Sequence, residues 1–556
     1  SSIALQKAIL TEYIPFLSRI LQENGTIQAP IKAVIRKGKE HFVCDERLAQ
    51  RIVAIKDKNK NALQKEALLS LKEHYDMDEV SGLSGFDRRM VSVPKFCSRE
   101  CPKKGSCRYQ QYLEHSRDDE MFIQICNHNY LLANASHRLE ERPLLLRQYQ
   151  ALVVDEAHKL PDAARQMYTE TLSAQDMDDL CSLLQQAHFK GLSKRLRTVF
   201  LTLSISCAPS FAMPKRKISI PFSLTPFRQA AIADSINLLQ YIGSQPDMPY
   251  YLQYRLAEAE SLLRLFLLDV PTRILYLEFS ADGQLTFCAA SNRVPQLLRS
   301  ALWNTREPTI LTSGTLTAAG DFDHTEQLLG LAAYAPLRHF RAESPFNYRK
   351  KCLLYIPARR AAAVPENQYL ADQIVRLTVA CHGHALVLFT SYRQMRNVYD
   401  ALGGRLTFPV FQAGRGQNRS IQQFKQSGNG VLFAAGSCWE GIDFPGDMVS
   451  LLIIAKLPFP IPDPVSNYER QQYPNLRDYI NAEVIPEMQK KLRQGFGRAI
   501  RTEQDSCVVA ILDERAGIGG KYHDAALAAL PTCPIAEKIE DVQQFIREQK
   551  RPDYFL

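Results

Sequence analysis

The sequence predicts an α/β protein built on doubly wound parallel sheets. Short runs that are apolar at every position alternate with stretches of helical length. Strands that are apolar on both faces are typical of buried parallel sheets, and helix-length spacers are typical of βαβ units. The chain has 556 residues, of which 46% are hydrophobic and 23% charged. That length suits about three to five domains, and the apolar content excludes an intrinsically disordered chain.

The second half of the chain carries this pattern most regularly. Its apolar runs are residues 385–389, 431–435, 451–454 and 507–512, and the segments between them are long enough for helices. We therefore expect one doubly wound α/β domain over residues 331–556.

The first half is predicted to be one α/β domain with two insertions. Residues 151–154 and 309–312 read as strands, the first a buried strand that stops at Asp155. The segment between them looks largely helical, because residues 227–268 carry apolar side chains at three- and four-residue spacing. Residues 32–115 are rich in Cys, Lys and Arg and form the other insertion.

Charge and cysteine content limit the function classes. The chain has 68 Lys and Arg against 59 Asp and Glu, a net charge of +9 that permits a polyanionic partner. It has no apolar run long enough to span a membrane and no signal peptide, so we expect a cytoplasmic protein without a membrane partner. Thirteen cysteines in that setting favour metal binding or catalysis over disulfides.

Two carboxylates end the strand at residues 151–154. Asp155 and Glu156, followed by Ala157 and His158, are expected at the carboxyl edge of a parallel sheet, where ligands bind in open α/β folds. The first carboxylate can hold Mg²⁺ and the second can orient or deprotonate an attacking water. The alternative is a polar helix cap. Four apolar residues directly before the pair favour the functional interpretation.

A basic segment with two glycines covers residues 494–501. Arg498 and Arg501 are three residues apart, so they are predicted to share a helix face, where paired guanidinium groups suit a γ-phosphate. The alternative is a solvated basic face. Because Gly495 and Gly497 are poor helix formers, we expect them to permit close backbone approach.

A third segment, residues 436–445, follows the strand at 431–435 and contains Gly441 and Asp443. A glycine-rich loop with an acid at a strand end can touch a nucleotide or a nucleic-acid backbone. Alone it is a weak signal.

Together these segments resemble the superfamily-2 helicases, and within them the DinG-like bacterial branch of the XPD/DinG family. The order and spacing of the motifs run through nearly the whole chain. The similar segments are residues 155–158 (DEAH box), 312–316 (motif III), 439–443 (motif V), 494–501 (motif VI), and, for the DinG-like branch, 127–129, 344–346 and 457–463.

The resemblance implies two RecA-like motor domains that clamp ATP, with an iron–sulfur domain and a helical arch inserted into the first. The implied division is residues 1–31, 116–165 and 301–330 for the first motor domain, 32–115 for the Fe–S domain, 166–300 for the arch, and 331–556 for the second motor domain.

The implied function is an ATP-dependent 5′–3′ DNA helicase of DNA repair or replication. It would act as a monomer on single-stranded and on forked or otherwise structured DNA. The implied roles are Mg²⁺ binding by Asp155, water activation by Glu156, linkage of the two motors by His158, contact with phosphate or water by Gln494, arginine fingers at Arg498 and Arg501, and nucleotide binding at Gly441, Asp443 and Gly497.

Four cysteines stand apart from the other nine: Cys44, Cys97, Cys101 and Cys107. Four thiolates can bind one Zn²⁺ or one iron–sulfur cluster, and the spacing fits no standard zinc finger. The resemblance implies a 4Fe–4S cluster. Cys126 is left out because it belongs to an apolar run.

Basic residues crowd these cysteines and suit a DNA backbone, although each could equally be a solvated surface residue. They are Arg36, Lys37, Lys39, Lys95, Arg99, Lys103, Lys104 and Arg108. Nearby aromatics could stack on bases or form the core of the small domain; these are Phe42, Phe96, Tyr109 and Tyr112. Tyr250, Tyr251 and Tyr254 are expected to be packing residues.

The sequence contains no phosphate-binding loop of the form G-x-x-x-x-G-K-[ST]. Residues 517–521 are a superficial match, but Tyr522 stands where Ser or Thr is needed. Residues 1–6 resemble motif Ia, which follows that loop in the family. We therefore expect a chain that lacks the first strand, loop and helix, and we expect this polypeptide to hydrolyse little or no ATP.

Two alternatives remain open. One is a non-enzymatic Fe–S DNA-binding module that has lost ATP hydrolysis, and the other is a zinc-stabilised structural protein. The presence of Glu156 and Arg498 favours the helicase over the module. An iron–sulfur cluster makes a protein brown, whereas zinc does not.

Overall fold

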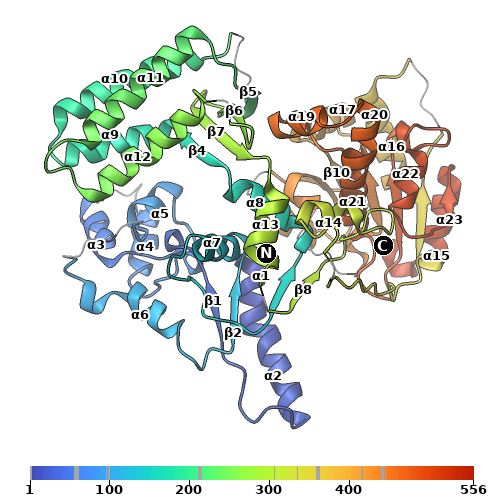
Figure 1. Ribbon diagram of the computed structural model, residues 1–556. Helices are drawn as coiled ribbons and strands as arrows, with labels where there is room; N and C mark the ends of the chain where they lie inside the picture. The colour runs from blue at the N-terminus through green and yellow to red at the C-terminus, as the bar shows by residue number, and fades with distance from the viewer. Residues whose placement is uncertain are drawn as a thin grey trace. The chain divides into compact units, whose positions relative to one another are not determined.

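The computed structural model describes residues 3–55, 62–94, 97, 101–210, 216–268, 270–305, 307–334, 336–358, 363–414, 418–439, 444 and 446–555. The chain divides into two compact units (Figure 1). The first unit is Ser1–Leu311 with Asp463–Val465, and the second is Thr312–Pro462 with Ser466–Leu556.

A seven-stranded parallel sheet forms the centre of the second unit. Its strand order is β11-β12-β10-β13-β14-β9-β15, and every pair of neighbours is parallel. The strands are β9 (Cys352–Tyr355), β10 (Ala385–Phe389), β11 (Val410–Gln412), β12 (Val431–Ala435), β13 (Leu451–Ile454), β14 (Cys507–Ile511) and β15 (Ile535–Ala536). The sequence predicted β10, β12, β13 and β14, and missed β9, β11 and β15.

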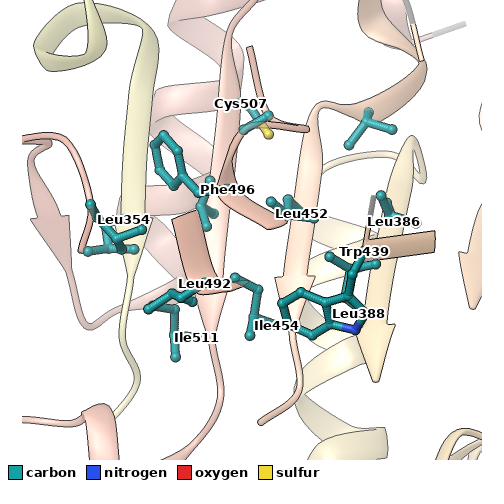
Figure 2. Packing of buried hydrophobic residues seen from close by; sticks show 14 of the residues in the cluster. Leu354, Leu386, Leu388, Trp439, Leu452, Ile454, Leu492, Phe496, Cys507 and Ile511 are labelled. Carbon is teal, nitrogen blue, oxygen red and sulfur yellow. The ribbon is translucent and has the colours of Figure 1, made fainter. Parts of the chain in front are cut away.

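Helices cover both faces of this sheet, so the predicted doubly wound architecture is confirmed. One face packs against α16 (Glu366–Ala380), α17 (Tyr392–Leu402) and α23 (Ile539–Gln549). The other packs against α18 (Asn418–Gln426), α21 (Ile485–Phe496) and α22 (His523–Ala528). Figure 2 shows Leu492 and Phe496 of α21 among buried side chains of the strands. The remaining helices are α14 (Asp323–Leu329), α15 (Tyr348–Lys351), α19 (Pro464–Gln471) and α20 (Leu476–Tyr479).

The first unit contains two short sheets in addition to its helices. Strands β1 (Ala33–Arg36) and β2 (Ile123–Cys126) pair in parallel, and β3 (Leu152–Asp155) pairs with β8 (Thr309–Thr312). The sequence predicted β3 as a buried strand, but Val153 is 62% exposed and only Val154 is buried. Among the described residues, β3 belongs to a two-stranded sheet, and the face of the strand that carries Val153 is exposed.

The segment expected to be largely helical also contains a sheet, which the sequence analysis missed. Four helices are present: α9 (Ala174–Gln186), α10 (Lys190–Cys207), α11 (Pro226–Gly243) and α12 (Tyr250–Leu265). They share one core with an antiparallel sheet of order β4-β7-β6-β5 (Figure 1). Its strands are β4 (Glu170–Ser173), β5 (Ile218–Pro221), β6 (Arg273–Phe279) and β7 (Leu285–Ser291).

The other helices of the first unit are short. They are α1 (Ile3–Ala8), α2 (Ile14–Glu23), α3 (Asp45–Ala54), α4 (Ala62–Ser70), α5 (Gly85–Val91), α6 (Arg108–His115), α7 (His128–Leu139), α8 (Leu160–Met167) and α13 (Val294–Leu298). Within the described ranges, no helix of either unit has the length and apolarity needed to cross a membrane.

Candidate functional site

The two carboxylates at the end of β3 are presented on a tight turn. β3 ends at Asp155, and a single 3₁₀ turn over Ala157–Lys159 leads into α8. Glu156 adopts a left-handed conformation with φ of 50°, which is uncommon for a residue with a side chain. Asp155 is exposed, and the Glu156 side chain is 43% exposed. Both carboxylates can therefore reach water and ions.

The helix-cap alternative for these carboxylates is not what the structure shows. The residues at the cap positions of the 3₁₀ turn and of α8 are Glu156 and Lys159, and neither accepts a capping hydrogen bond through its side chain. Instead, Glu156 Oε2 lies 3.2 Å from Nδ1 of His158, whose side chain is only 9% exposed. The neighbouring imidazole thus restrains the second carboxylate.

A second histidine, His128, contacts the same end of β3. Nε2 of His128 lies 2.9 Å from the carbonyl oxygen of Asp155. Burial lowers the pKa of His128, so its neutral ring donates this hydrogen bond through Nε2. Asn127 holds the histidine in place, because its side chain caps α7 by accepting a hydrogen bond from the Tyr130 amide at 2.8 Å. Residues 127–129 are similar to the DinG-like branch, but no role was predicted for His128.

Within the second unit, the segment of motif III contacts the helix that carries motif VI. Nε2 of Gln494 donates to Oγ1 of Thr315 at 3.3 Å, and Nη1 of Arg493 donates to Oγ1 of Thr317 at 3.1 Å. Both threonines are buried, at 6% and 8% exposure. The Thr315 amide donates a hydrogen bond to Oγ of Ser313 at 3.1 Å, which helps to fix the position of Thr315. The structure therefore brings two predicted motifs together and adds Arg493, which the sequence analysis missed.

The predicted shared helix face for Arg498 and Arg501 is wrong. Helix α21 ends at Phe496 with Gly497 as its C-cap, so both arginines lie beyond the helix. Arg498 is buried and its Nη2 donates to the Trp439 carbonyl at 3.3 Å, whereas Arg501 is exposed.

Two features explain why the helix stops. Gly495 and Gly497 have low helix propensity. The carboxylate of Asp505 also accepts hydrogen bonds from the Arg501 and Thr502 amides, both at 2.8 Å, and so binds amides that a longer helix would use. The burial of Arg498 also excludes a solvated basic face at that position.

The close approach expected at the glycines of this segment is confirmed at Gly495. A Cβ atom there would lie 2.8 Å from Cζ3 of Trp439, well inside contact distance. Trp439 is 1% exposed and lies in the buried cluster of Figure 2. Its Nε1 donates to the Phe389 carbonyl at 2.9 Å. Gly497 is exposed at the end of the helix. Gly441 and Asp443 lie outside the described residues.

The four predicted cysteine ligands lie near one another in the first unit. Cys44 and Cys107 immediately precede α3 and α6 and pack against the same aromatic cluster. Partial burial raises the pKa of the Cys97 thiol, and the sulfurs of Cys44, Cys107 and Cys101 raise it further by charge repulsion. Across the described ranges, no three Cys, His, Asp or Glu side chains are grouped tightly enough to hold a metal ion. The thiols thus supply a suitable donor set without a formed ligand geometry.

Cys126 was left out of this set because of its apolar surroundings. It lies in β2, and burial raises its pKa to about 11, which keeps the thiol protonated.

The aromatic residues beside the cysteines belong to the core of the small domain. Phe42, Tyr109 and Tyr112 are buried and pack together, with the rings of Phe42 and Tyr112 4.4 Å apart. The base-stacking alternative is therefore not supported for these three residues, and Phe96 lies outside the described residues.

The basic residues around the cysteines separate into two classes. Arg36, Lys37 and Arg108 have structural partners: Arg36 bonds Ser116 and the Leu145 carbonyl, Lys37 pairs with Asp76 and Asp78, and Arg108 bonds Asp45. Lys39, Lys103 and Lys104 are exposed. Lys95 and Arg99 lie outside the described residues.

The prediction that Tyr250, Tyr251 and Tyr254 are packing residues is wrong. They are 77%, 37% and 39% exposed. Helix α12 instead buries Leu252, Leu256, Ala259, Leu262 and Leu263.

Asp513 is a structural residue that the sequence analysis missed. It follows β14 and accepts hydrogen bonds from the Leu457 amide at 2.9 Å and from Nη2 of Arg515 at 2.7 Å. Burial alone would raise its pKa, but these hydrogen bonds bring the pKa below its ordinary value. The charged carboxylate therefore fastens the start of the 457–463 segment to the sheet. Its position directly after a buried strand was the available signal, as it was for Asp155.

Comparisons with known proteins agree with this architecture. Residues 374–532 match the family described as Helicase C-terminal domain. The chain is 26% identical to the ATP-dependent DNA helicase YoaA of Escherichia coli K12, covering 98% of this chain and 88% of that protein. It is also 26% identical to the ATP-dependent helicase DinG of Mycobacterium tuberculosis H37Rv, covering 100% of this chain and 88% of that protein. A solved XPD helicase structure has a similar fold, with a TM-score of 0.52 and 17% identity over 94% of this chain and 90% of that chain.

Proposed function

Because the chain belongs to the XPD/DinG family of superfamily-2 helicases, we propose that it is an ATP-dependent DNA helicase of the DinG type that acts in DNA repair. The observation that carries this proposal is the pair of accessible carboxylates, Asp155 and Glu156, on an uncapped turn at the end of β3. That arrangement suits Mg²⁺ and an attacking water, the two requirements of phosphoryl transfer to water.

The residue roles form part of the proposal. Asp155 binds Mg²⁺ and Glu156 activates water, with His158, the residue expected to link the motors, placed beside Glu156. Gln494, whose side chain is hydrogen-bonded to Thr315, contacts phosphate or water. Gly441, Asp443 and Gly497 complete the nucleotide contacts.

The two proposed arginine fingers start from different environments. Arg501 is exposed. Arg498 is bonded to the Trp439 carbonyl and would exchange that hydrogen bond for one to phosphate.

Single-stranded DNA, including forked and structured forms, is the proposed partner, with 5′–3′ translocation by a monomer in the cytoplasm. The support is the similarity to the ATP-dependent DNA helicase YoaA and the excess of positive charge. The proposed layout keeps residues 1–31, 116–165 and 301–330 as the first motor domain, 32–115 as the Fe–S domain, 166–300 as the arch and 331–556 as the second motor domain.

We also propose that Cys44, Cys97, Cys101 and Cys107 hold a 4Fe–4S cluster. The support is the proximity of the other three sulfurs to Cys97 and the thiolate preference of such clusters. Anaerobically purified protein is expected to be brown and to contain about four iron atoms per chain. Cys107→Ser should lose iron and colour, whereas Cys126→Ser should keep both. Zinc in place of iron would contradict this assignment.

The helicase proposal is tested by comparing two polypeptides. One is the chain as printed, and the other is the product that begins upstream of Ser1, if the coding sequence there supplies an in-frame G-x-x-x-x-G-K-[ST]. We expect the longer product to hydrolyse ATP in response to single-stranded DNA and to unwind duplexes with a 5′ tail. Glu156→Gln should reduce its ATP turnover on the order of 10²–10⁴-fold. DNA binding without ATP hydrolysis by the longer product would favour the non-enzymatic module.

A further inference from the structure

Three cysteines lie side by side in the second unit, two at the starts of neighbouring strands and one just before β15. Cys507 at the start of β14 is in register with Cys352 at the start of β9. On the other side of β9, Leu354 is in register with Ile535 of β15, and the Leu354 amide donates to the Pro534 carbonyl at 2.9 Å. Cys352 lies two residues before Leu354, and Cys533 lies two residues before Ile535. Cys533 is therefore expected beside Cys352, on the side of β9 opposite to Cys507.

All three side chains lie on the same face of the sheet. Cys352 and Cys507 are fully buried in the apolar cluster that also contains Leu492 and Phe496 of α21, and Cys533 packs against that cluster. Figure 2 shows Cys507 with Leu492 and Phe496 in this cluster. Cys533 retains partial exposure. The row therefore runs from the interior to a position that small solutes can reach.

The spacing of Cys352 and Cys533 suits a disulfide bond. Neighbouring strands lie about 4.8 Å apart, and disulfides join residues whose Cα atoms are about 4.4–6.8 Å apart. Cys352 and Cys533 are free thiols in the structure and are hydrogen-bonded to each other. That hydrogen bond lowers the pKa of Cys533 and, together with burial, raises the pKa of Cys352. Cys533 is therefore the more nucleophilic sulfur of the two at neutral pH.

Cys507 differs from this pair. Burial raises its pKa to about 12, and its Sγ donates to the Val508 carbonyl at 3.4 Å. It thus remains a protonated core residue.

We propose that Cys352 and Cys533 form a redox-sensitive thiol pair that closes to a disulfide when a hydroperoxide oxidises Cys533. The Cys533 thiolate attacks one peroxide oxygen, the O–O bond breaks, and Cys533 becomes a sulfenic acid as hydroxide (or alkoxide) leaves. Cys352 sulfur then attacks the sulfenic sulfur, the S–O bond breaks, and the hydroxyl leaves as water. The two thiols are oxidised by two electrons in total, and the peroxide is reduced.

The bond would connect β9 to the outermost strand of the sheet. It would close a loop from residue 352 to residue 533 that contains the whole helicase-type match at 374–532. It would also lie on the sheet face that α21 covers, beneath the helix of motif VI. Where thiols are kept reduced, such bonds are usually transient and act as redox sensors.

The test maps thiols in the full printed chain after reduction and exposure to hydrogen peroxide. Free thiols are blocked with an alkylating reagent, and the digest is analysed by mass spectrometry without reductant. We expect a cross-linked peptide that joins Cys352 and Cys533, a loss of two free thiols from the second unit, and reversal by dithiothreitol. Cys533→Ser should abolish the cross-link, and the matched variant Cys381→Ala, at a buried cysteine of the same unit, should retain it.

Two results would overturn the proposal. One is alkylation of both Cys352 and Cys533 at peroxide doses that oxidise other cysteines of the unsubstituted chain. The other is a cross-link between Cys352 and Cys507, which would assign the chemistry to the buried pair. Because the primary measurement uses the unsubstituted chain, poor folding of a variant does not affect the outcome.

Discussion

Gly495 and Trp439 lie in contact across the face of the second sheet. A Cβ atom at position 495 would come within 2.8 Å of Cζ3 and 2.9 Å of Cε3 of the indole. The glycine follows Gln494 and the tryptophan carbonyl binds Arg498, so this contact joins the backbones of two predicted motifs. Its tightness means that residue 495 must remain small.

Gly495→Ala is expected to destabilise the second unit by about 1–3 kcal/mol, because the indole is fixed by its hydrogen bond to Phe389 and cannot move aside freely. Chemical denaturation measures the change. The matched control is Gly191→Ala in the exposed part of α10, where nothing lies within 4 Å of an added Cβ. That control should be neutral or stabilising by up to about 1 kcal/mol. Equal effects at the two positions would contradict the steric argument.

Arg493 and Thr317 should be energetically coupled, since a partly buried guanidinium donates to a buried hydroxyl. In a double-mutant cycle with Arg493→Ala and Thr317→Val, we expect a coupling free energy of about 0.5–3 kcal/mol in unfolding experiments. Additive effects of the two substitutions would show that the hydrogen bond contributes nothing to stability.

Asp513→Asn should change how stability depends on pH. The pKa of Asp513 is lowered in the folded state, so its ionised form stabilises the fold above the ordinary aspartate pKa of about 3.9, and this contribution fades as pH falls through the lowered folded value. We expect the variant to lose about 2 kcal/mol at neutral pH and progressively less as the pH falls below about 4. Melting curves across this range check the prediction. Asp553→Asn, at an exposed position, is the matched control.

Phe42→Ala should act through folding rather than through DNA contact. Phe42 is 2% exposed and packs against Tyr75, Tyr109 and Tyr112, so truncation should cost about 3–5 kcal/mol. Tyr250→Ala, at a 77% exposed position, should change stability by no more than about 0.5 kcal/mol. DNA affinity measured on folded samples separates the two roles: a folded Phe42→Ala protein with selectively weakened DNA binding would restore the stacking hypothesis.

In the second unit, the strands that the sequence predicted are those where burial is continuous. Strands β10, β12 and β13 were predicted with their observed bounds, because every residue of each strand is buried on both faces. Strand β9 was missed because it directly follows the charged helix α15. The antiparallel strands β4 to β7 were missed because long helices dominate the apolar pattern around them.

The candidate site shows the same pattern. Features that depend on neighbouring residues in the sequence were predicted, and contacts between residues distant in the sequence were missed. Asp155 and Glu156 were found because they directly follow an apolar run. The end of α21 at Phe496 was not found, because three-residue spacing between Arg498 and Arg501 does not reveal whether a helix continues. Arg493 and Asp513 were missed because their partners, Thr317 and Leu457, are distant in the sequence.

The burial of Trp439 has an optical consequence. The chain contains two tryptophans, and the other, Trp303, lies in the first unit and is also buried, at 5% exposure. Each unit therefore carries a single tryptophan, and its side chain is buried. In a Trp303→Phe protein, the remaining emission would report on the second unit alone, and it would come from the indole that contacts Gly495.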